Sequence, residues 1–264
     1  MSDEPTPSDL ERQLRQHIDS LRSAGIEWVP TTPQSSSPPG ATRPLTLVSD
    51  ASVQVSLFAS TPQTEVVSAD QESRLQQLQA LRAQVAACTR CPQLASTRTQ
   101  TVFGVGPLDP EICFVGEAPG AEEDRKGEPF VGPAGQLLDR IIAACGMRRE
   151  EVYICNILRC RPPGNRQPQV DEAEHCKEWL EKTIALVRPR WICALGGTAV
   201  THLLGITQGI TRLRGRIFEY RGIPVLCTFH PSYLLRSPEK KRDVWEDMKL
   251  LLGKLGRPIP GKPA

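Results

Sequence analysis

The sequence contains no long apolar run. No stretch reaches the roughly 18 consecutive apolar residues that a membrane-spanning helix requires, which excludes proteins with helical membrane spans. The first residues, MSDEPTPSDLERQL, also lack the basic and apolar regions of a secretory signal. We therefore expect a cytoplasmic protein without a membrane partner.

Lysine is absent from the first 75 residues. They carry five Arg against ten Asp and Glu, a net charge of −5, whereas residues 76–264 carry 27 basic and 20 acidic side chains, a net charge of +7. A basic folded part behind an acidic segment is compatible with a polyanionic partner such as DNA. A modest excess of this size equally serves solubility alone.

Residues 30–70 are poor in lysine and arginine and rich in Pro, Ser and Thr. Such a segment buries too little apolar surface to offset the entropy of ordering, which predicts a disordered linker. Residues 1–29 predict an N-terminal helical segment, either a docking element or a frayed helix without a role. Its apolar residues stand at helical spacing: Leu10, Leu14, Ile18 and Leu21.

Residues 71–256 are predicted to form the folded domain, with a flexible tail at 257–264. An amphipathic helix is expected at 71–88. Apolar or β-branched runs, most of them separated by helical patterns, follow at 111–116, 151–157, 190–196 and 223–229. This alternation predicts an α/β fold of three layers, with helices on both faces of a central four-stranded, mostly parallel sheet. Ligands bind such sheets beyond the carboxyl ends of the strands.

The nine cysteines are an odd number, and a reducing compartment favours metal binding over disulfides. Four of them lie in strand-like runs, as core residues do: Cys113, Cys155, Cys193 and Cys227. Four others predict a site of four thiolates: Cys88 and Cys91 in a C-x-x-C pair, Cys160 and Cys176. Their spacing does not separate zinc from an iron–sulfur cluster, and free thiols are the third alternative.

Three polar or aromatic residues stand near predicted strand ends. Asn156 closes an apolar strand, and its amide presents an acceptor and a donor that match the O4 and N3–H edge of uracil. Phe130 follows a glycine-rich loop, where its ring could stack on a flat ligand. His230 ends the fourth strand and could stabilise a developing anion. Each residue alone has a structural alternative.

Four motifs together resemble family 4 uracil-DNA glycosylases. They are GEAPGAEEDRKGEPFVGPAGQLLD, CNILRCRPPGNRQP, LGGTA and HPSYLLRSPEKK, in order between about residues 80 and 252. The resemblance implies the uracil-DNA glycosylase fold, hydrolysis of the N-glycosidic bond of uracil in DNA, and a [4Fe–4S] cluster. The cluster ligands that it implies are Cys88, Cys91, Cys160 and Cys176.

The resemblance also implies roles for single residues around a flipped-out uracil. Phe130 would stack on the base, Asn156 would read its Watson–Crick edge, and His230 would donate a hydrogen bond to O2 as negative charge grows. Backbone groups around Glu117 and Ala118 would contact the ring. The family offers Glu123 as the acid that orients water or supports the sugar cation, with Glu122 and Asp124 as alternatives.

The segment HPSYLLR resembles the loop that fills the gap left by the flipped nucleotide. Leu234 is the predicted wedge between base steps. Four side chains could hold phosphates or merely start a solvated helix: Ser232, Arg236, Lys240 and Lys241. Three arginines near the predicted cluster could contact the DNA backbone: Arg159, Arg161 and Arg166.

A related clade traps uracil covalently through a histidine in a basic insertion after the GPAG stretch. This sequence has no such insertion or histidine there, since GPAGQLLDR leads directly into the predicted helix. We therefore expect turnover. No feature of the sequence demands an oligomer, so a monomer is expected, and its location is expected to be cytoplasmic and nucleoid-associated. The alternatives are a glycosylase for hypoxanthine or xanthine, and a non-catalytic iron–sulfur module that binds DNA.

One further resemblance lies in the predicted linker. Residues Gln54–Phe58, QVSLF, resemble the Q-L-[SD]-L-F peptides by which bacterial repair proteins hold the sliding clamp. A glutamine with aliphatic and aromatic anchors suits a peptide that docks into a hydrophobic groove. Five-residue matches also arise by chance. The sliding clamp is thus a candidate partner besides uracil-containing DNA.

Overall fold

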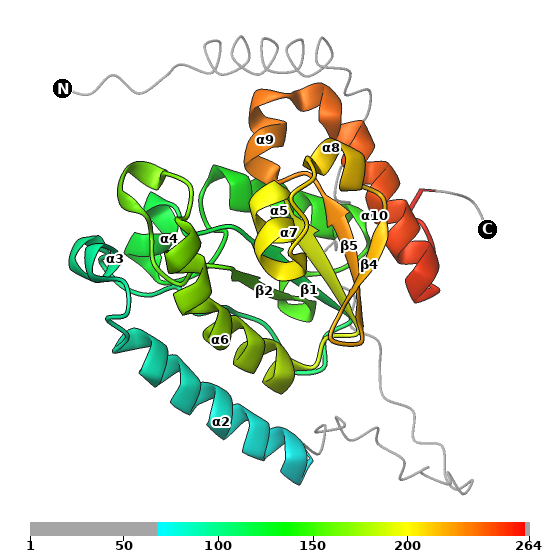
Figure 1. The fold of residues 1–264 in the computed structure, drawn as a ribbon. Coiled ribbons are helices and arrows are strands. Elements are labelled where there is room, and N and C mark those ends of the chain that lie inside the picture. The colour runs from blue at the N-terminus through cyan, green and yellow to red at the C-terminus, as the bar shows by residue number, and fades with distance from the viewer. Residues whose placement is uncertain (1–67, 262–264) are drawn as a thin grey trace, which may run out of the picture. The chain divides into compact units, whose positions relative to one another are not determined.

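A computed structural model describes residues 68–261 of the chain (Figure 1). The predicted N-terminal segment at 1–29, nearly all of the linker at 30–70 and the peptide at 54–58 lie outside the described residues. Between residues 68 and 261, no helix combines the length and the apolar character that a membrane crossing requires.

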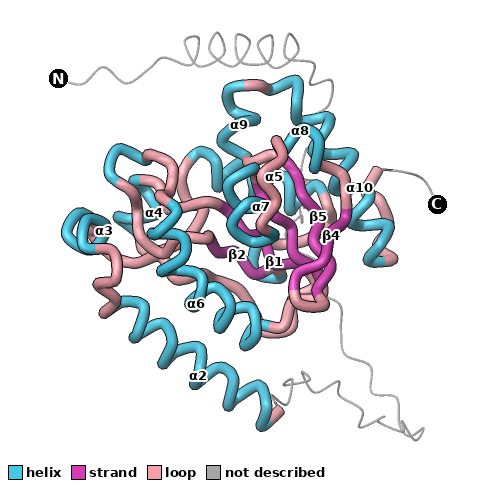
Figure 2. Tube along the Cα trace, viewed as in Figure 1, coloured by secondary structure: helices cyan, strands magenta, loops and turns pink. Residues whose placement is uncertain are grey.

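The core is a five-stranded sheet in the order β2-β1-β3-β5-β4, and Figure 2 draws its strands in magenta. Its four parallel strands match the four predicted runs: β1 (Ile112–Gly116), β2 (Tyr153–Asn156), β3 (Trp191–Leu195) and β5 (Ile223–Thr228). The prediction of four strands is wrong by one. The additional strand β4 (Ile217–Tyr220) pairs antiparallel with β5 at the edge, where its residues stay half-buried or exposed and give no apolar run.

Helices cover both faces of this sheet, which confirms the predicted three layers. On one face, α6 (Val170–Val187) and α7 (Gly197–Leu204) pack on the sheet, and α2 (Ala69–Ala86) lies against α6 (Figure 1). On the other face lie α5 (Pro133–Ala144) and α10 (Lys241–Leu255). The short helices are α3 (Pro92–Thr97), α4 (Ala121–Lys126), α8 (Ile210–Leu213) and α9 (Pro231–Arg236).

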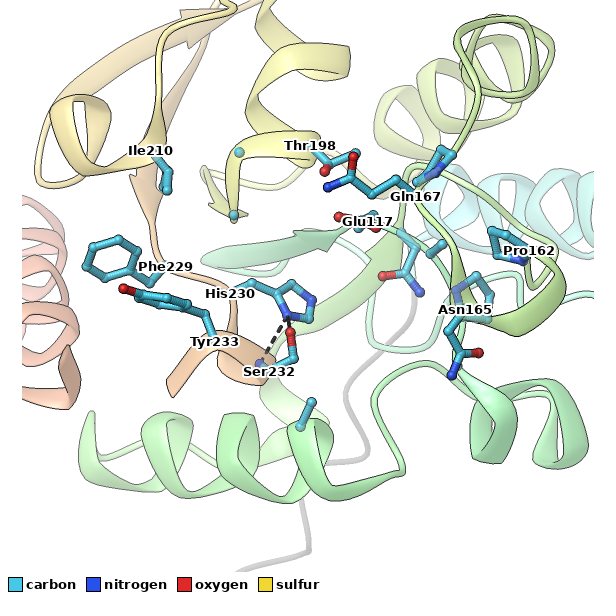
Figure 3. Close-up of a pocket in the computed structure, with 18 of the residues that line it drawn as sticks. Glu117, Pro162, Asn165, Gln167, Thr198, Ile210, Phe229, His230, Ser232 and Tyr233 are labelled. Carbon is cyan, nitrogen blue, oxygen red and sulfur yellow. Dashed lines mark hydrogen bonds between the residues drawn. The ribbon is translucent and has the colours of Figure 1, made fainter. Parts of the chain in front are cut away.

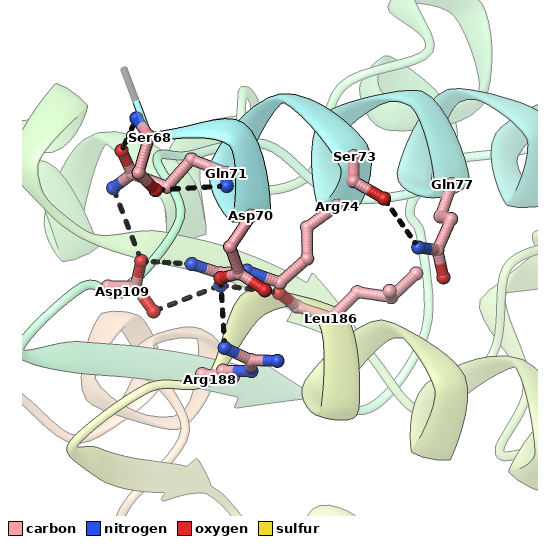
Figure 4. Close-up of polar contacts among 9 residues, drawn as sticks. All are labelled: Ser68, Asp70, Gln71, Ser73, Arg74, Gln77, Asp109, Leu186 and Arg188. Carbon is pink, nitrogen blue, oxygen red and sulfur yellow. Dashed lines mark hydrogen bonds and ion pairs between the residues drawn. The ribbon is translucent and has the colours of Figure 1, made fainter. Parts of the chain in front are cut away.

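A buried arginine helps to fix helix α2 to the domain (Figure 4). Arg74 donates to Asp70, to both carboxylate oxygens of Asp109 and to the backbone oxygen of Leu186. The Arg74 guanidinium holds the pKa of Asp109 below its usual range. The helix begins with a capping box between Ser68 and Gln71, two residues before the predicted start. Because α2 ends just before Cys88, these contacts also set the position of the first predicted cluster ligands.

Candidate active site

A pocket of about 1020 Å³ opens at the carboxyl ends of the parallel strands. The segments that follow β1, β2, β3 and β5 all line it, as expected for ligand sites in parallel sheets. In Figure 3, Glu117 and Thr198 face His230 across the pocket, and Asn165 comes from the loop that follows β2. Glu117 and Ala118 both line the pocket, and the Glu117 backbone oxygen already accepts from Leu158.

Asn156 ends β2 with 2% of its surface exposed. Its Oδ1 atom has no hydrogen-bond partner among residues 68–261. A buried acceptor without a partner costs free energy and calls for a ligand or a water molecule. Gly116 stands beside Asn156 in the sheet, and a Cβ atom there would lie 2.4 Å from Oδ1. The absence of a side chain at Gly116 therefore provides the space that the Asn156 amide occupies.

Phe130 is held in a conformation that aromatic residues rarely adopt. Its φ angle is +54°, in the left-handed region, and its ring is buried. A Cβ atom on Gly135 would come within 1.8 Å of the Phe130 backbone oxygen, so the chain turns back at close range here. Arg149 donates to the oxygen of Pro129 at 2.6 Å. These contacts keep the Phe130 ring 5.5 Å from that of His230.

His230 follows β5 and caps helix α9. Its Nδ1 atom accepts the backbone N–H of Ser232 at 3.1 Å and lies 2.7 Å from the Ser232 hydroxyl. A backbone N–H only donates, so Nδ1 is the acceptor and Nε2 carries the proton. Burial, with a smaller contribution from the charge of Arg236, lowers the pKa of His230 to about 4. The ring is therefore a neutral donor at physiological pH.

Glu123 organises the loop between β1 and α5. One carboxylate oxygen accepts the backbone N–H groups of Val131 and Gly132, both at 2.9 Å, and the other accepts that of Gly120 at 3.0 Å. Two oxygens offer about four lone-pair sites, so one site remains for a water molecule. The role in water orientation stays a prediction, and the structure adds a positioning role.

The two alternative acids lie elsewhere. Glu122 pairs with Arg125 at 2.7 Å at the rim of the pocket. Asp124 is buried, does not line the pocket, and accepts the backbone N–H of Thr99 at 2.9 Å. Asp124 is thus wrong as a candidate for water activation, because its carboxylate ties α4 to another loop.

Replacing Glu123 with alanine is expected to lower the free energy of unfolding by about 2 kcal/mol, because three backbone donors lose their acceptor. Denaturant melts measure this. The Glu122→Ala variant is the control, since its carboxylate pairs only with an exposed arginine and is expected to change stability by less than about 0.5 kcal/mol. Equal stability of the two variants would contradict the positioning role.

Comparison with known proteins identifies the family. The model of the uracil DNA glycosylase superfamily matches residues 103–249. The chain belongs to this superfamily. It is 48% identical to the type-4 uracil-DNA glycosylase of Thermotoga maritima over 166 residues, covering 61% of this chain and 86% of the relative. It is 38% identical to that of Archaeoglobus fulgidus over 185 residues, covering 67% and 92%.

In this member of the uracil DNA glycosylase superfamily, Leu234 faces the core. Its exposed fraction is 0%, against 44% for Leu235. The prediction of Leu234 as the wedge is therefore wrong, because the segment forms a helix that turns Leu234 inward. Leu235 lines the pocket instead, together with Ser232 and Arg236. Helical spacing within HPSYLLR, with Pro231 and Leu234 on one buried side, was the signal that could have indicated this.

The basic side chains near the site divide into three groups. Arg159 is buried and donates to Phe103 and Thr183, so its predicted contact with DNA is wrong. Arg166 lines the pocket and pairs with the buried Glu172 at 2.6 Å. The remaining three lie outside the pocket lining: Arg161, which donates to Asn165, Lys240, which pairs with Asp243 at 3.4 Å, and Lys241.

The four predicted ligand cysteines lie against one hydrophobic cluster. Cys88 and Cys91 are half-buried, Cys160 and Cys176 are buried, and all four are free thiols. Burial, and then the charges of Cys176, Cys160, Glu172 and Cys88, raise the pKa of Cys91 to about 12. Arg98 donates to the Cys160 sulfur at 3.0 Å.

No group of three or more His, Cys, Asp or Glu side chains within residues 68–261 is arranged to hold a single metal ion. A single zinc ion requires four sulfurs about 2.3 Å from one centre. A cluster of four irons and four sulfides binds each thiolate to a different iron and so needs them farther apart. All four predicted ligands are cysteines, the residue type whose thiolates bind iron–sulfur clusters.

Proposed function

We propose that this chain is a monofunctional uracil-DNA glycosylase. It hydrolyses the N-glycosidic bond of uracil flipped out of DNA and leaves an abasic site, as in base excision repair. The unpartnered, buried Oδ1 of Asn156 carries this proposal, because it can accept from a ligand with a donor such as uracil N3–H. Membership of the superfamily and the type-4 relatives support the same reaction.

The pocket residues first bind the flipped base and then stabilise the charge that develops on it as the bond breaks. Phe130 stacks on the ring, and the Asn156 amide accepts from N3–H and donates to O4. The bond between N1 and C1′ breaks, and its electron pair moves into the uracil ring. The Nε2–H group of His230 donates to O2, where this negative charge gathers, and so stabilises the transition state more than the ground state. Water then bonds to C1′ and gives up a proton to the solvent, and the uracil anion leaves and takes up a proton from the solvent.

Glu123 is proposed to serve this reaction through its backbone contacts and its remaining acceptor site. Its hydrogen bonds to Val131 and Gly132 hold the loop beside Phe130. The remaining lone-pair site can accept a hydrogen bond from the attacking water and so orient the water oxygen toward C1′. The rate of the Glu123→Gln variant at saturating substrate measures this second role, separately from the stability of the fold.

A gel assay with excess uracil-containing oligonucleotide and alkaline cleavage of abasic sites tests the function. We expect several turnovers per enzyme on uracil and none on thymine. Parallel oligonucleotides with hypoxanthine and xanthine test the broader specificity. Binding of DNA without release of any of these bases would instead indicate the non-catalytic module.

Cys88, Cys91, Cys160 and Cys176 are proposed to hold a [4Fe–4S] cluster. When bound, the cluster supplies four iron–thiolate bonds that cross-link the segment after α2, the segment after β2 and helix α6. We expect about four irons and four sulfides per chain in anaerobically purified protein, lost in Cys160→Ala but retained in the Cys145→Ala control. One zinc per chain would overturn the cluster.

Leu235 is proposed as the side chain that fills the gap left by the flipped nucleotide, with Ser232 and Arg236 beside the DNA backbone. Leu234→Ala is expected to destabilise the fold by about 2 to 5 kcal/mol, because its side chain is buried. Leu235→Ala is expected to leave stability within about 0.5 kcal/mol and to slow excision from duplex DNA. Thermal melts and excision assays of both variants measure the contrast, and equal destabilisation would contradict it.

The sliding clamp is proposed as a partner of residues Gln54–Phe58, which lie outside the described residues. A 15-residue peptide centred on QVSLF is expected to bind the clamp in anisotropy titrations, and the peptide with Leu57→Ala and Phe58→Ala is expected not to bind. Equal affinity of the two peptides would remove this proposal.

A further inference from the structure

A second hollow, of about 640 Å³, lies away from the strand ends. Three cations from three segments line it: Arg82 on α2, Arg98 directly after α3 and Lys126 at the end of α4. Its lining contains one acidic residue, Glu128, so the hollow carries a net positive charge. Figure 1 shows α3 and α4 at the side of the molecule reached by the end of α2.

These cations lack the acidic partners that most arginines of the domain have. Within residues 68–261, no ion pair includes Arg82, Arg98 or Lys126. By contrast, Arg149 and Arg166 each pair with a carboxylate at 2.6 Å. Unpaired positive charges gathered in one hollow favour an anionic ligand.

Two of the cations are held in place by the backbone. Arg98 donates to the Ala86 oxygen at 3.1 Å and to the Cys160 sulfur at 3.0 Å. Arg82 donates to the Gly104 oxygen at 3.2 Å, and its guanidinium lies 5.7 Å from the ring centre of Phe103. A guanidinium has five N–H donors, so both arginines keep donors for a ligand while their positions are fixed.

Helix α4 connects the two hollows. Its first residues, 121–123, line the pocket at the strand ends, and Lys126 at its other end lines the basic hollow. Six residues of helix span about 9 Å, and successive base pairs of B-DNA rise about 3.4 Å. Only one short helix therefore separates the two hollows, so a DNA strand with its uracil in the first pocket has nearby phosphates within reach of the second.

We propose that Arg82, Arg98 and Lys126 form a binding site for the phosphodiester backbone of the DNA strand, within a few nucleotides of the flipped base. This rests on the proposed function for the identity of the strand. Arg98 then joins the phosphate site to the Cys160 thiol, since one guanidinium serves both. The site adds affinity without reading sequence, because phosphates are the same at every position.

The test uses the variant Arg82→Gln with Lys126→Gln, which leaves Arg98 and its contact with Cys160 intact. The control variant, Lys177→Gln with Lys254→Gln, removes the same charge from residues that line neither hollow. Fluorescence anisotropy with a His230→Ala background measures the dissociation constant for uracil-containing DNA at several salt concentrations. We expect about tenfold weaker binding and a salt slope reduced by about 1 to 2, against little change in the control.

The length of the DNA strand provides a second test of the phosphate site. Oligonucleotides are shortened so that one end lies within two nucleotides of the uracil, first on one side and then on the other. When the shortened side is the one that reaches the basic hollow, the variant and the wild type are expected to bind with the same dissociation constant. When the variant Arg82→Gln with Lys126→Gln retains the native His230, its excision rate at saturating DNA is expected to stay within about twofold of wild type. The reason is that neither Arg82 nor Lys126 lines the first pocket.

The outcomes separate the two proposals. If wild type excises uracil while the hollow variant keeps the salt slope of wild type, or the control loses as much, the phosphate site is overturned and the proposed function stands. If wild type excises nothing while the hollow variant alone weakens DNA binding, the proposed function fails and the phosphate site stands.

Discussion

Replacing His230 with alanine is expected to lower kcat for uracil excision by about 10²- to 10³-fold, with little change in KM. The reason is the fixed direction of its proton. Ser232 binds Nδ1 through a backbone N–H, so Nε2–H is the donor that meets the growing charge on O2. Removing one such preorganised donor from an enzyme typically costs this much in rate. Single-turnover excision at saturating DNA measures it.

The pH dependence of the wild type tests the protonation state of His230. Because burial lowers its pKa to about 4, the ring stays neutral from alkaline pH down to about pH 5. We therefore expect that the titration of His230 does not change the single-turnover rate over that range, and that the rate changes only as pH falls toward 4. A rate that fell as pH rose through about 6.5 would mean that the charged imidazolium is the donor, contrary to the proposal.

Replacing Asn156 with alanine is expected to reduce kcat/KM for uracil DNA by about 10²- to 10³-fold. Two hydrogen bonds to the base are lost, one of them to an oxygen that becomes partly anionic. At about 1.5 to 2 kcal/mol each, with 1.4 kcal/mol per tenfold change, they account for this loss. Excision at limiting substrate concentration measures kcat/KM directly.

Asn165→Ala is the matched control for Asn156. Asn165 also lines the pocket, but it is exposed and its amide oxygen accepts from Arg161 at 2.7 Å. We expect less than a threefold change in kcat/KM for this variant, because about 0.5 kcal/mol is typical of a surface position. Similar losses at both positions would show that the pocket does not read the base through Asn156.

The sequence predicted the layers of the fold and the position of the pocket because both depend on long-range regularities. Apolar runs with compatible spacing identified β1, β2, β3 and β5. The edge strand β4 was not predicted although Ile217, Phe218 and Tyr220 favour strands, because it has only four residues and Glu219 interrupts its apolar pattern. Its residues are half-buried or exposed, so a long apolar run is not required there.

Side-chain direction was harder to predict than position. Leu234 and Leu235 are identical in chemistry and adjacent, and only the helical turn of α9 decides which of them is buried. Arg159 stands in a basic segment of the sequence, yet its guanidinium enters the core and donates to Thr183. The positioning role of Glu123 was likewise not predicted. The three groups that donate to its carboxylate are backbone N–H groups, which nearly every residue type supplies.

Gly116 has a consequence for how this pocket can evolve. A Cβ atom at this position would lie 2.4 Å from the Asn156 amide and 2.5 Å from the Phe130 ring. Every other amino acid would displace both groups at once, so mutation at this position cannot alter base recognition gradually. Substitution at Gly116 therefore perturbs the amide and the ring together, and a base preference that alters only one of them must arise from another position in the pocket.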